Sequence, residues 1–224
     1  MDLFSEPETP YIRKQKNDMG IFNKGDYKPI PADFRTLGIL SLQELSKFQE
    51  KFEIYDTDTT INSIRDAMVA NYLNYDLLNF NKHGFDAKKS KTNEFLEIKQ
   101  CSISSGRLGG TWNDTNEEKA KAFSDKRLFT AVAISKGASD LQFIVYGQHK
   151  NLGKYLLDKV RYRKEGSRST QSVGIEKLLR EYNFDIVCPP DKKKEFILQL
   201  IVNYQRNLAE NVKLSNIKRI QDFQ

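Results

Sequence analysis

Residues 84–99 of the chain read GFDAKKSKTNEFLEIK, and this stretch decides the fold that we expect. Asp86 lies in a short strand-like segment, and a strand-like alternation resumes at Glu94–Cys101 after a polar, turn-forming segment. If Ser90–Asn93 form a four-residue loop, antiparallel partners have residue numbers that sum to 183, which places Asp86 opposite Glu97. The sequence therefore predicts a β-hairpin with two carboxylates on one side of a sheet.

Two facing carboxylates favour a hard divalent cation. Directly opposed residues have Cβ atoms about 5 Å apart, so Asp86 and Glu97 repel each other unless a proton or a cation lies between them. Mg²⁺ is typically held by one or two carboxylates together with water and phosphate oxygens. Lys99 shares the face of Glu97 and adds an ammonium group beside the carboxylates. We therefore expect a Mg²⁺ site with a neighbouring lysine.

Asp86, followed after ten residues by Glu97-Ile98-Lys99, resembles the motif of the PD-(D/E)xK nuclease superfamily, which includes most type II restriction endonucleases. The resemblance implies that Asp86 and Glu97 bind Mg²⁺. It also implies that the backbone carbonyl of Ile98 adds a ligand and that Lys99 positions or activates the attacking water. Phe85 stands where the family has a Pro. The implied fold is α/β, a restriction-endonuclease-like core in which helices flank a mixed central β-sheet.

The helix ahead of the hairpin bears on the site, because some members of the superfamily take a further acidic residue from it. Asp56–Thr60 predict the cap of this second helix. Its expected apolar stripe comprises Ile61, Ile64, Met68, Tyr72 and Tyr75. Asp66 projects about 160° away from Met68 around a helix, so we expect Asp66 on the solvent side and leave it out of the site.

The other segments predict the rest of the α/β order. Ser41–Phe52 have apolar residues at helical spacing, with Ser41 as the N-cap of a first helix. A helix at Asn116–Lys126 is followed by buried strands at Leu128–Ser135 and Leu141–Tyr146. A short strand is expected at Phe184–Cys188. This order of hairpin, crossover helix and strands is compatible with the nuclease core.

Residues 102–116 follow the second strand of the hairpin and are rich in glycine and small polar side chains. We expect a DNA-facing loop, and the alternative is a glycine-rich surface loop. One Asn or Gln amide can make two hydrogen bonds to the edge of an adenine, whereas arginine prefers guanine. Gln100, Asn113 and Asn116 outnumber Arg107 here, which favours an A·T-rich target.

Residues 150–168 contain seven basic and two acidic residues, a local charge of +5 within a chain of net charge +6. This segment is either a phosphate-contacting strip or a solvated helix face. The residues predicted to contact DNA are Gln100, Ser102, Ser104, Ser105, Arg107, Thr111, Trp112, Asn113, Asn116, Arg161, Arg163 and Arg168.

The domain prediction is an extended arm at residues 1–31 and a single nuclease domain at residues 32–224. The arm wraps DNA or a partner subunit, or it is a poorly ordered terminus. The domain contains the catalytic hairpin at 84–101, the loop at 102–116 and a C-terminal helical segment at 191–224. That last segment packs either on the core or on another subunit. Because cutting both strands of a symmetric site needs two active sites, we expect a homodimer.

The sequence lacks the features expected of membrane-spanning, secreted and zinc-binding proteins. No apolar run approaches a membrane span, and Met1–Glu6 lack the features of a signal peptide, so a cytoplasmic, bacterial protein without a membrane partner is expected. Cys101 and Cys188 have no zinc-site spacing, and His83 and His149 are interpreted as structural.

The predicted function is a Mg²⁺-dependent type II restriction endonuclease that cuts double-stranded DNA at a specific, palindromic sequence. Two alternatives stay open. One is another nuclease of the same superfamily, namely a junction resolvase, a repair nuclease or a phage exonuclease. The other is a non-catalytic DNA-binding or assembly protein, in which the hairpin charges form only a surface ion-pair cluster.

Overall fold

The computed structural model describes residues 32–78, 85–89, 91–113, 115–162, 170–204, 212 and 216–223. The predicted N-terminal arm therefore lies outside the described residues. The chain divides into two units, Met1–Thr60 and Ile61–Gln224. Helix α1 (Ala32–Phe52) lies in the first unit, and helix α2 (Thr57–Tyr72) begins there and continues into the second.

The two predicted helix starts have different outcomes. The prediction that Ser41 caps the first helix is wrong, because α1 is already helical before it and the Ser41 hydroxyl donates to the Leu37 carbonyl at 2.9 Å. The predicted cap of the second helix is confirmed. The Asp56 carboxylate accepts a hydrogen bond from the Thr59 backbone N–H at 2.7 Å, and α2 begins directly after Asp56.

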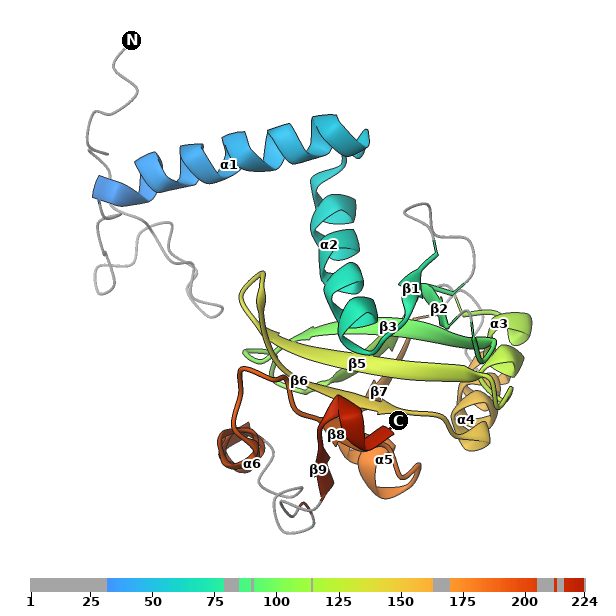
Figure 1. The fold of residues 1–224 in the computed structure, drawn as a ribbon. Coiled ribbons are helices and arrows are strands. Elements are labelled where there is room, and N and C mark those ends of the chain that lie inside the picture. Colours follow the sequence, from blue (N-terminus) through green and yellow to red (C-terminus); the bar gives the residue numbers. More distant parts are fainter. Residues whose placement is uncertain are drawn as a thin grey trace, which may run out of the picture. The chain divides into compact units, whose positions relative to one another are not determined.

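In the described part of the second unit, seven strands form a mixed sheet in the order β1-β2-β3-β5-β6-β8-β9 (Figure 1). The pairs β3–β5 and β8–β9 are parallel, and the other neighbouring pairs are antiparallel. The predicted α/β class with a mixed central sheet flanked by helices is confirmed. The strands are β1 (Asp76–Leu77), β2 (Ala87–Lys89), β3 (Glu94–Ser102), β5 (Leu128–Lys136), β6 (Asp140–Gly147), β8 (Asp185–Val187) and β9 (Ile217–Lys218).

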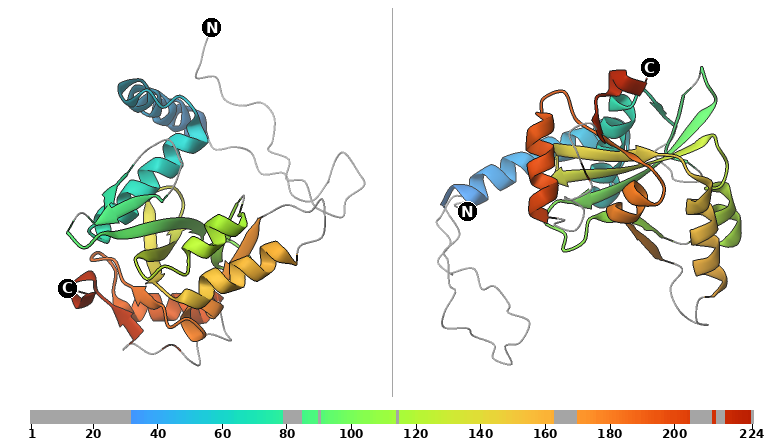
Figure 2. Two further views of the ribbon diagram at one scale, coloured as in Figure 1. Left: turned by 90° about the vertical axis from the view of Figure 1, so that its right-hand side faces the viewer. Right: turned by 90° about the horizontal axis from the view of Figure 1, so that it is seen from below.

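Helices cover both faces of this sheet (Figures 1 and 2). On one face, the second-unit part of α2 packs its buried residues on Leu96 and Ile98 of β3. The opposite face contacts a larger apolar cluster, to which four further helices contribute buried side chains. These helices are α3 (Glu117–Ala122), α4 (Lys150–Arg161), α5 (Ile175–Arg180) and α6 (Lys194–Tyr204). None of the helices in the described part of the chain is long and apolar enough to cross a membrane.

The predicted apolar stripe of α2 is confirmed at its end, where Tyr72 and Tyr75 pack in the core, but it is wrong along the rest of the helix. The buried residues of α2 include Ser63, Asp66 and Val69, whereas Met68 is exposed. The buried residues of this helix therefore include three polar side chains, Thr60, Ser63 and Asp66, which a hydrophobic pattern assigns to solvent. Asp66 is only 4% exposed, so our expectation that it faces solvent is also wrong.

The segment predicted as a loop at 102–116 contains a strand. Strand β4 (Gly109–Trp112) pairs antiparallel with β7 (Gln171–Gly174), in a second, two-stranded sheet. A side chain at Gly109 would collide with the backbone carbonyl of Val173, so this pairing needs glycine. The partner strand lies far away in the sequence, and no local pattern in the loop indicates it.

The later strands follow the prediction closely, whereas the helix predicted at Asn116–Lys126 is shorter, because α3 ends at Ala122. Strands β5 and β6 confirm the two expected buried strands, and β8 confirms the short strand. The described residues between 191 and 223 are only partly helical, since they comprise α6, strand β9 and a 3₁₀ helix at Ile220–Phe223. The Arg219 guanidinium between β9 and the 3₁₀ helix donates to the Lys192 carbonyl at 2.8 Å. The end of the chain therefore packs on the core as an added strand.

Candidate active site

The hairpin has the predicted register. Asn93 adopts a left-handed conformation with φ of 55°, and its N–H donates to the Lys89 carbonyl at 3.1 Å, which closes the turn. Residue numbers of paired positions in β2 and β3 sum to 183, in the pairs Ala87 with Leu96, Lys88 with Phe95 and Lys89 with Glu94. Asp86 lies directly before β2, and the register extended by one residue places it opposite Glu97.

The three predicted catalytic side chains are held close to the hairpin backbone. The Asp86 carboxylate accepts a hydrogen bond from the Ile98 N–H, with 2.6 Å between Oδ2 and N. The Glu97 side chain is buried, and its Oε1 accepts from the Lys99 ammonium at 2.5 Å. Glu97 and Lys99 share one face of β3, as their spacing of two residues predicts.

Asp86, Glu97 and Lys99 line one pocket of about 550 Å³. Its remaining walls come from the residue before Asp86, from β4 and the turn after it, and from α3. These residues are Phe85, Thr111, Asn113, Asn116, Glu118, Lys119 and Ala122. The structure therefore brings the predicted catalytic residues together with three of the predicted DNA contacts, Thr111, Asn113 and Asn116.

The electrostatic environment of the pocket changes the pKa of the Asp86 carboxyl group. Its pKa is raised from 3.8 to about 6, chiefly because burial disfavours the charged form and then because Glu97 is close. The Ile98 hydrogen bond and the Lys99 ammonium act in the opposite direction, and Asp66 adds a smaller upward contribution. A buried carboxyl group whose proton affinity is raised by a second carboxylate in this way is a site for a proton or a cation.

Lys99 lies beside Trp112 of the second sheet. Its Nζ lies 5.9 Å from the centre of the Trp112 ring, and that ring packs edge-on against Phe123 at 6.0 Å. A Cβ atom at Gly110 would lie 2.8 Å from the Trp112 ring and 3.2 Å from the Lys99 Cβ. Gly110 therefore leaves the room that Trp112 and Lys99 occupy.

Two residues predicted to contact DNA, Trp112 and Gln100, instead make contacts within the protein. Trp112 is 0% exposed, and this burial does not fit direct contact with DNA. The Gln100 amide donates to the Asp66 carboxylate at 3.0 Å, on the α2 side of the sheet and away from Glu97. Asp66 is thus buried near the site but is not among the residues that line the pocket.

Other predicted DNA contacts have partners within the protein. The Asn116 side chain caps α3 by accepting from the Lys119 N–H at 2.7 Å. The Arg161 guanidinium pairs with the Glu117 carboxylate at 3.0 Å. The Ser105 hydroxyl donates to the backbone carbonyl of Arg107 at 3.0 Å.

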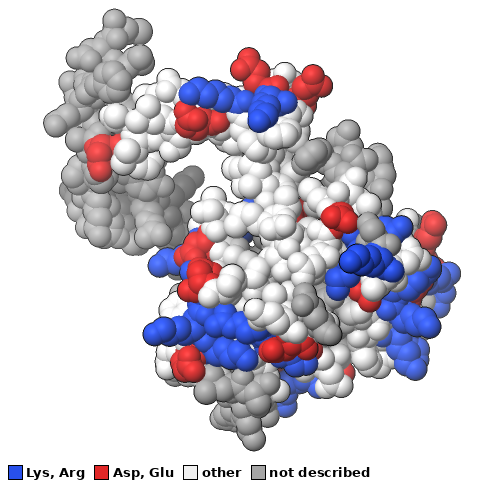
Figure 3. Space-filling view, in the orientation of Figure 1, with Lys and Arg blue, Asp and Glu red and all other residues white. Residues whose placement is uncertain are grey.

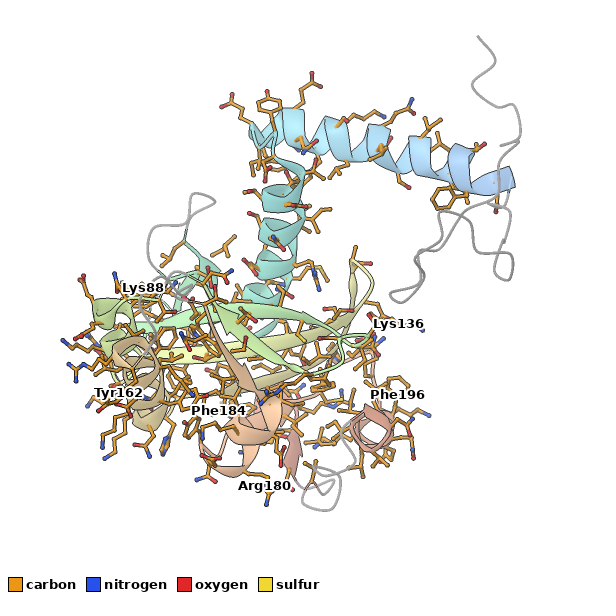
Figure 4. The ribbon with its side chains drawn as sticks, turned by 180° about the vertical axis from the view of Figure 1, so that it is seen from behind. Lys88, Lys136, Tyr162, Arg180, Phe184 and Phe196 are labelled. Carbon is orange, nitrogen blue, oxygen red and sulfur yellow. The ribbon has the colours of Figure 1, made fainter. Side chains whose placement is uncertain are left out.

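The predicted DNA-facing segment is divided between three places. Ser102 and Ser104 line a second pocket with Lys136. Figure 4 shows Lys136 and the hairpin residue Lys88 at opposite ends of the sheet. Arg107 lines a third pocket beside α5. Arg163 and Arg168 lie outside the described residues.

Sequence reasoning missed Lys119. Its ammonium lies 4.0 Å from the Glu97 carboxylate, and it lines the same pocket from α3. The available signal was its place in the first helix after the catalytic strand, since that helix crosses over to the parallel neighbour β5. That signal does not single out Lys119 from Lys121, because it does not define which face of the helix meets the hairpin.

Metal ligands of other types are not grouped here. Among the described residues, no cluster of three or more His, Cys, Asp or Glu side chains is placed to hold a metal ion. Cys101 and Cys188 are both buried, and His149 stacks on Tyr182 at 5.4 Å and caps α4. His83 lies outside the described residues. Asp86 and Glu97 form a pair of carboxylates in the pocket and not such a cluster.

No protein-family model matches this sequence, and no curated protein matches it.

Proposed function

We propose that this protein is a Mg²⁺-dependent endonuclease that hydrolyses phosphodiester bonds in double-stranded DNA. The observation that carries the proposal is the convergence of Asp86, Glu97 and Lys99 in one pocket. The same three residues form the PD-(D/E)xK-like motif in the sequence. The mixed sheet, with a hairpin followed by a strand parallel to β3, is compatible with a restriction-endonuclease-like core.

The donor set fits a magnesium ion. Two carboxylates suffice when water and phosphate oxygens complete the coordination. The raised pKa of Asp86 marks a place where added positive charge is favourable. Asp86, Glu97 and the Ile98 carbonyl would hold the ion, which when bound would supply charge neutralisation at the phosphate and a more acidic water.

The protein's own groups have separate tasks in this proposal. Lys99 presents its ammonium group beside the carboxylates, where it stabilises charge that develops on the phosphate oxygens. Glu97 keeps the Lys99 ammonium in place through the contact of 2.5 Å. The Ile98 N–H orients the Asp86 carboxylate. Fixed groups of this kind need no reorganisation during the reaction, which is the physical source of their effect.

The proposal extends to a type II restriction enzyme that cuts a specific, palindromic sequence as a homodimer. Thr111 and Asn113 support sequence reading, because they lie in the pocket wall beside the carboxylates and have hydrogen-bonding side chains. The dimer is tested by sedimentation with and without duplex DNA, and a monomer under both conditions would remove it.

The test of the function is incubation with mixed-sequence duplex DNA and Mg²⁺, followed by sequencing of the new ends. We expect discrete fragments from the wild-type protein and none from Asp86→Asn or Lys99→Met. Lys89→Met is the matched control, because Lys89 lies on the same hairpin but outside the pocket. Ends without a common sequence would favour a repair or structure-specific nuclease. DNA binding without cutting would favour a non-catalytic binding protein.

A further inference from the structure

Helix α3 forms one wall of the pocket and contains none of the motif residues. Glu118, Lys119 and Ala122 of this helix line the pocket. Their spacing places them on one side of α3, and the neighbouring residue Lys121 projects about 160° away from Lys119. The Lys121 ammonium accordingly pairs with Glu117 at 3.5 Å, outside the pocket.

The Lys119 ammonium is close to the catalytic carboxylate but is not fully used there. Its distances to the Glu97 carboxylate and to the Asn113 carbonyl are 4.0 Å and 3.5 Å, and 38% of its side chain is exposed. An ammonium group has three donors. Lys99, by comparison, is 16% exposed and holds Glu97 at 2.5 Å. Lys119 thus keeps donors for a ligand at the open side of the pocket.

The charge of the pocket favours an anion only if Lys119 is counted. Its lining contains three acidic residues, Asp86, Glu97 and Glu118, and two lysines, which give a net charge of −1. One divalent cation would change this to +1, which balances a single phosphodiester group. Without Lys119 the same site would be neutral towards the DNA backbone. The space-filling view also shows Lys and Arg side chains gathered over the end of the molecule where α3 and α4 lie (Figure 3).

We propose that Lys119 binds a phosphate group of the DNA backbone next to the bond that is cut, while Lys99 serves the reacting phosphate. Asn116 is a positioning residue in this arrangement, because its side chain caps α3 at the Lys119 N–H. The proposal rests on the nuclease function but concerns a DNA contact that exists without cleavage.

The test measures binding and not cutting. The affinity of the full chain for a fluorescent mixed-sequence duplex is measured by anisotropy with Ca²⁺ in place of Mg²⁺, at several salt concentrations. Each lost phosphate contact lowers the slope of log K against log salt by about 0.9. We expect Lys119→Met to lose this much slope and about three- to tenfold in affinity at low salt. Lys119→Arg restores the slope, and Lys121→Met leaves it unchanged. A thermal melt confirms that each variant is folded.

The possible results separate the two proposals. If the wild-type protein cuts DNA but Lys119→Met keeps the wild-type slope, the Lys119 contact is wrong and the nuclease function stands. If Lys119→Met loses slope but the wild-type protein cuts no DNA with Mg²⁺, the contact stands and the nuclease function is wrong. A wild-type protein that does not bind duplex DNA at low salt overturns both. Equal losses in Lys119→Met and Lys121→Met also overturn the specific role of Lys119.

Discussion

The hairpin carries two pairs of a glutamate and a lysine, and they differ in almost every physical respect. Glu97 and Lys99 lie in the pocket at 2.5 Å, with side chains that are 4% and 16% exposed. Glu94 and Lys89 are cross-strand partners at 3.3 Å, and each is 27% exposed. Because side chains alternate along β3, the first pair faces the larger cluster and the second faces the α2 side.

An ion pair between a glutamate and a lysine is therefore not sufficient to form a candidate active site. An ion pair that is open to water contributes little, typically up to about 1 kcal/mol. The Glu97 pair differs because Asp86 adds a second carboxylate in a buried setting, where neighbouring charges strongly affect one another. Burial and a second acid, and not the residue types alone, separate the two pairs.

The largest expected effect comes from removing the charge of each glutamate in turn. Glu97→Gln should lower the rate of Mg²⁺-dependent DNA cleavage by a factor on the order of 10³, because a buried, fixed charge is lost from the site. Glu94→Gln should leave the rate within about twofold and stability within about 1 kcal/mol. Initial rates on a plasmid substrate measure both. Equal losses in the two variants would show that the hairpin is only structural.

The next largest effect is the pH dependence of protein stability that Asp86 causes. The folded protein holds the Asp86 proton more tightly than the unfolded chain, since the pKa rises from 3.8 to about 6. The stability that this gives is present below pH 4 and is lost as the pH rises to about 6. Asp86→Asn avoids the loss, so it should be more stable than the wild-type protein at pH 8 by up to about 3 kcal/mol.

This gain should fall to below about 1 kcal/mol at pH 4, where Asp86 is protonated in the folded protein and partly protonated in the unfolded chain. Chemical denaturation in EDTA at the two pH values measures it, with Glu94→Gln as the matched control on the same strand. If Asp86→Asn is less stable than the wild-type protein at pH 8, then the ionised Asp86 carboxylate does not destabilise the folded protein, and the prediction is wrong.

The smallest expected effect tests the support beneath Lys99. Gly110→Ala should lower the cleavage rate about tenfold, because the new methyl group meets the Trp112 ring and displaces Lys99 from its position. Gly106→Ala is the matched control, since a Cβ atom there meets nothing within 4 Å. If both variants cut at the wild-type rate, the Trp112 contact does not position Lys99.

Local patterns predicted the hairpin well, because the information lies in adjacent residues. The turn-forming segment and the alternation of β3 define the register that pairs Lys89 with Glu94. The buried strands β5 and β6 were visible for the same reason, as continuous apolar runs. By contrast, α2 was assigned the wrong face, since Ser63 and Asp66 lie on its buried side.

Local sequence is enough to specify which residues of the hairpin share a face, since alternation along a strand is a property of the local backbone. The tertiary structure alone decided that α3 brings Lys119 to Glu97. It also decided that β4 pairs with β7, which buries Trp112 under Lys99. Contacts of this kind join segments that are far apart in the chain, and they arise from packing and not from any short pattern.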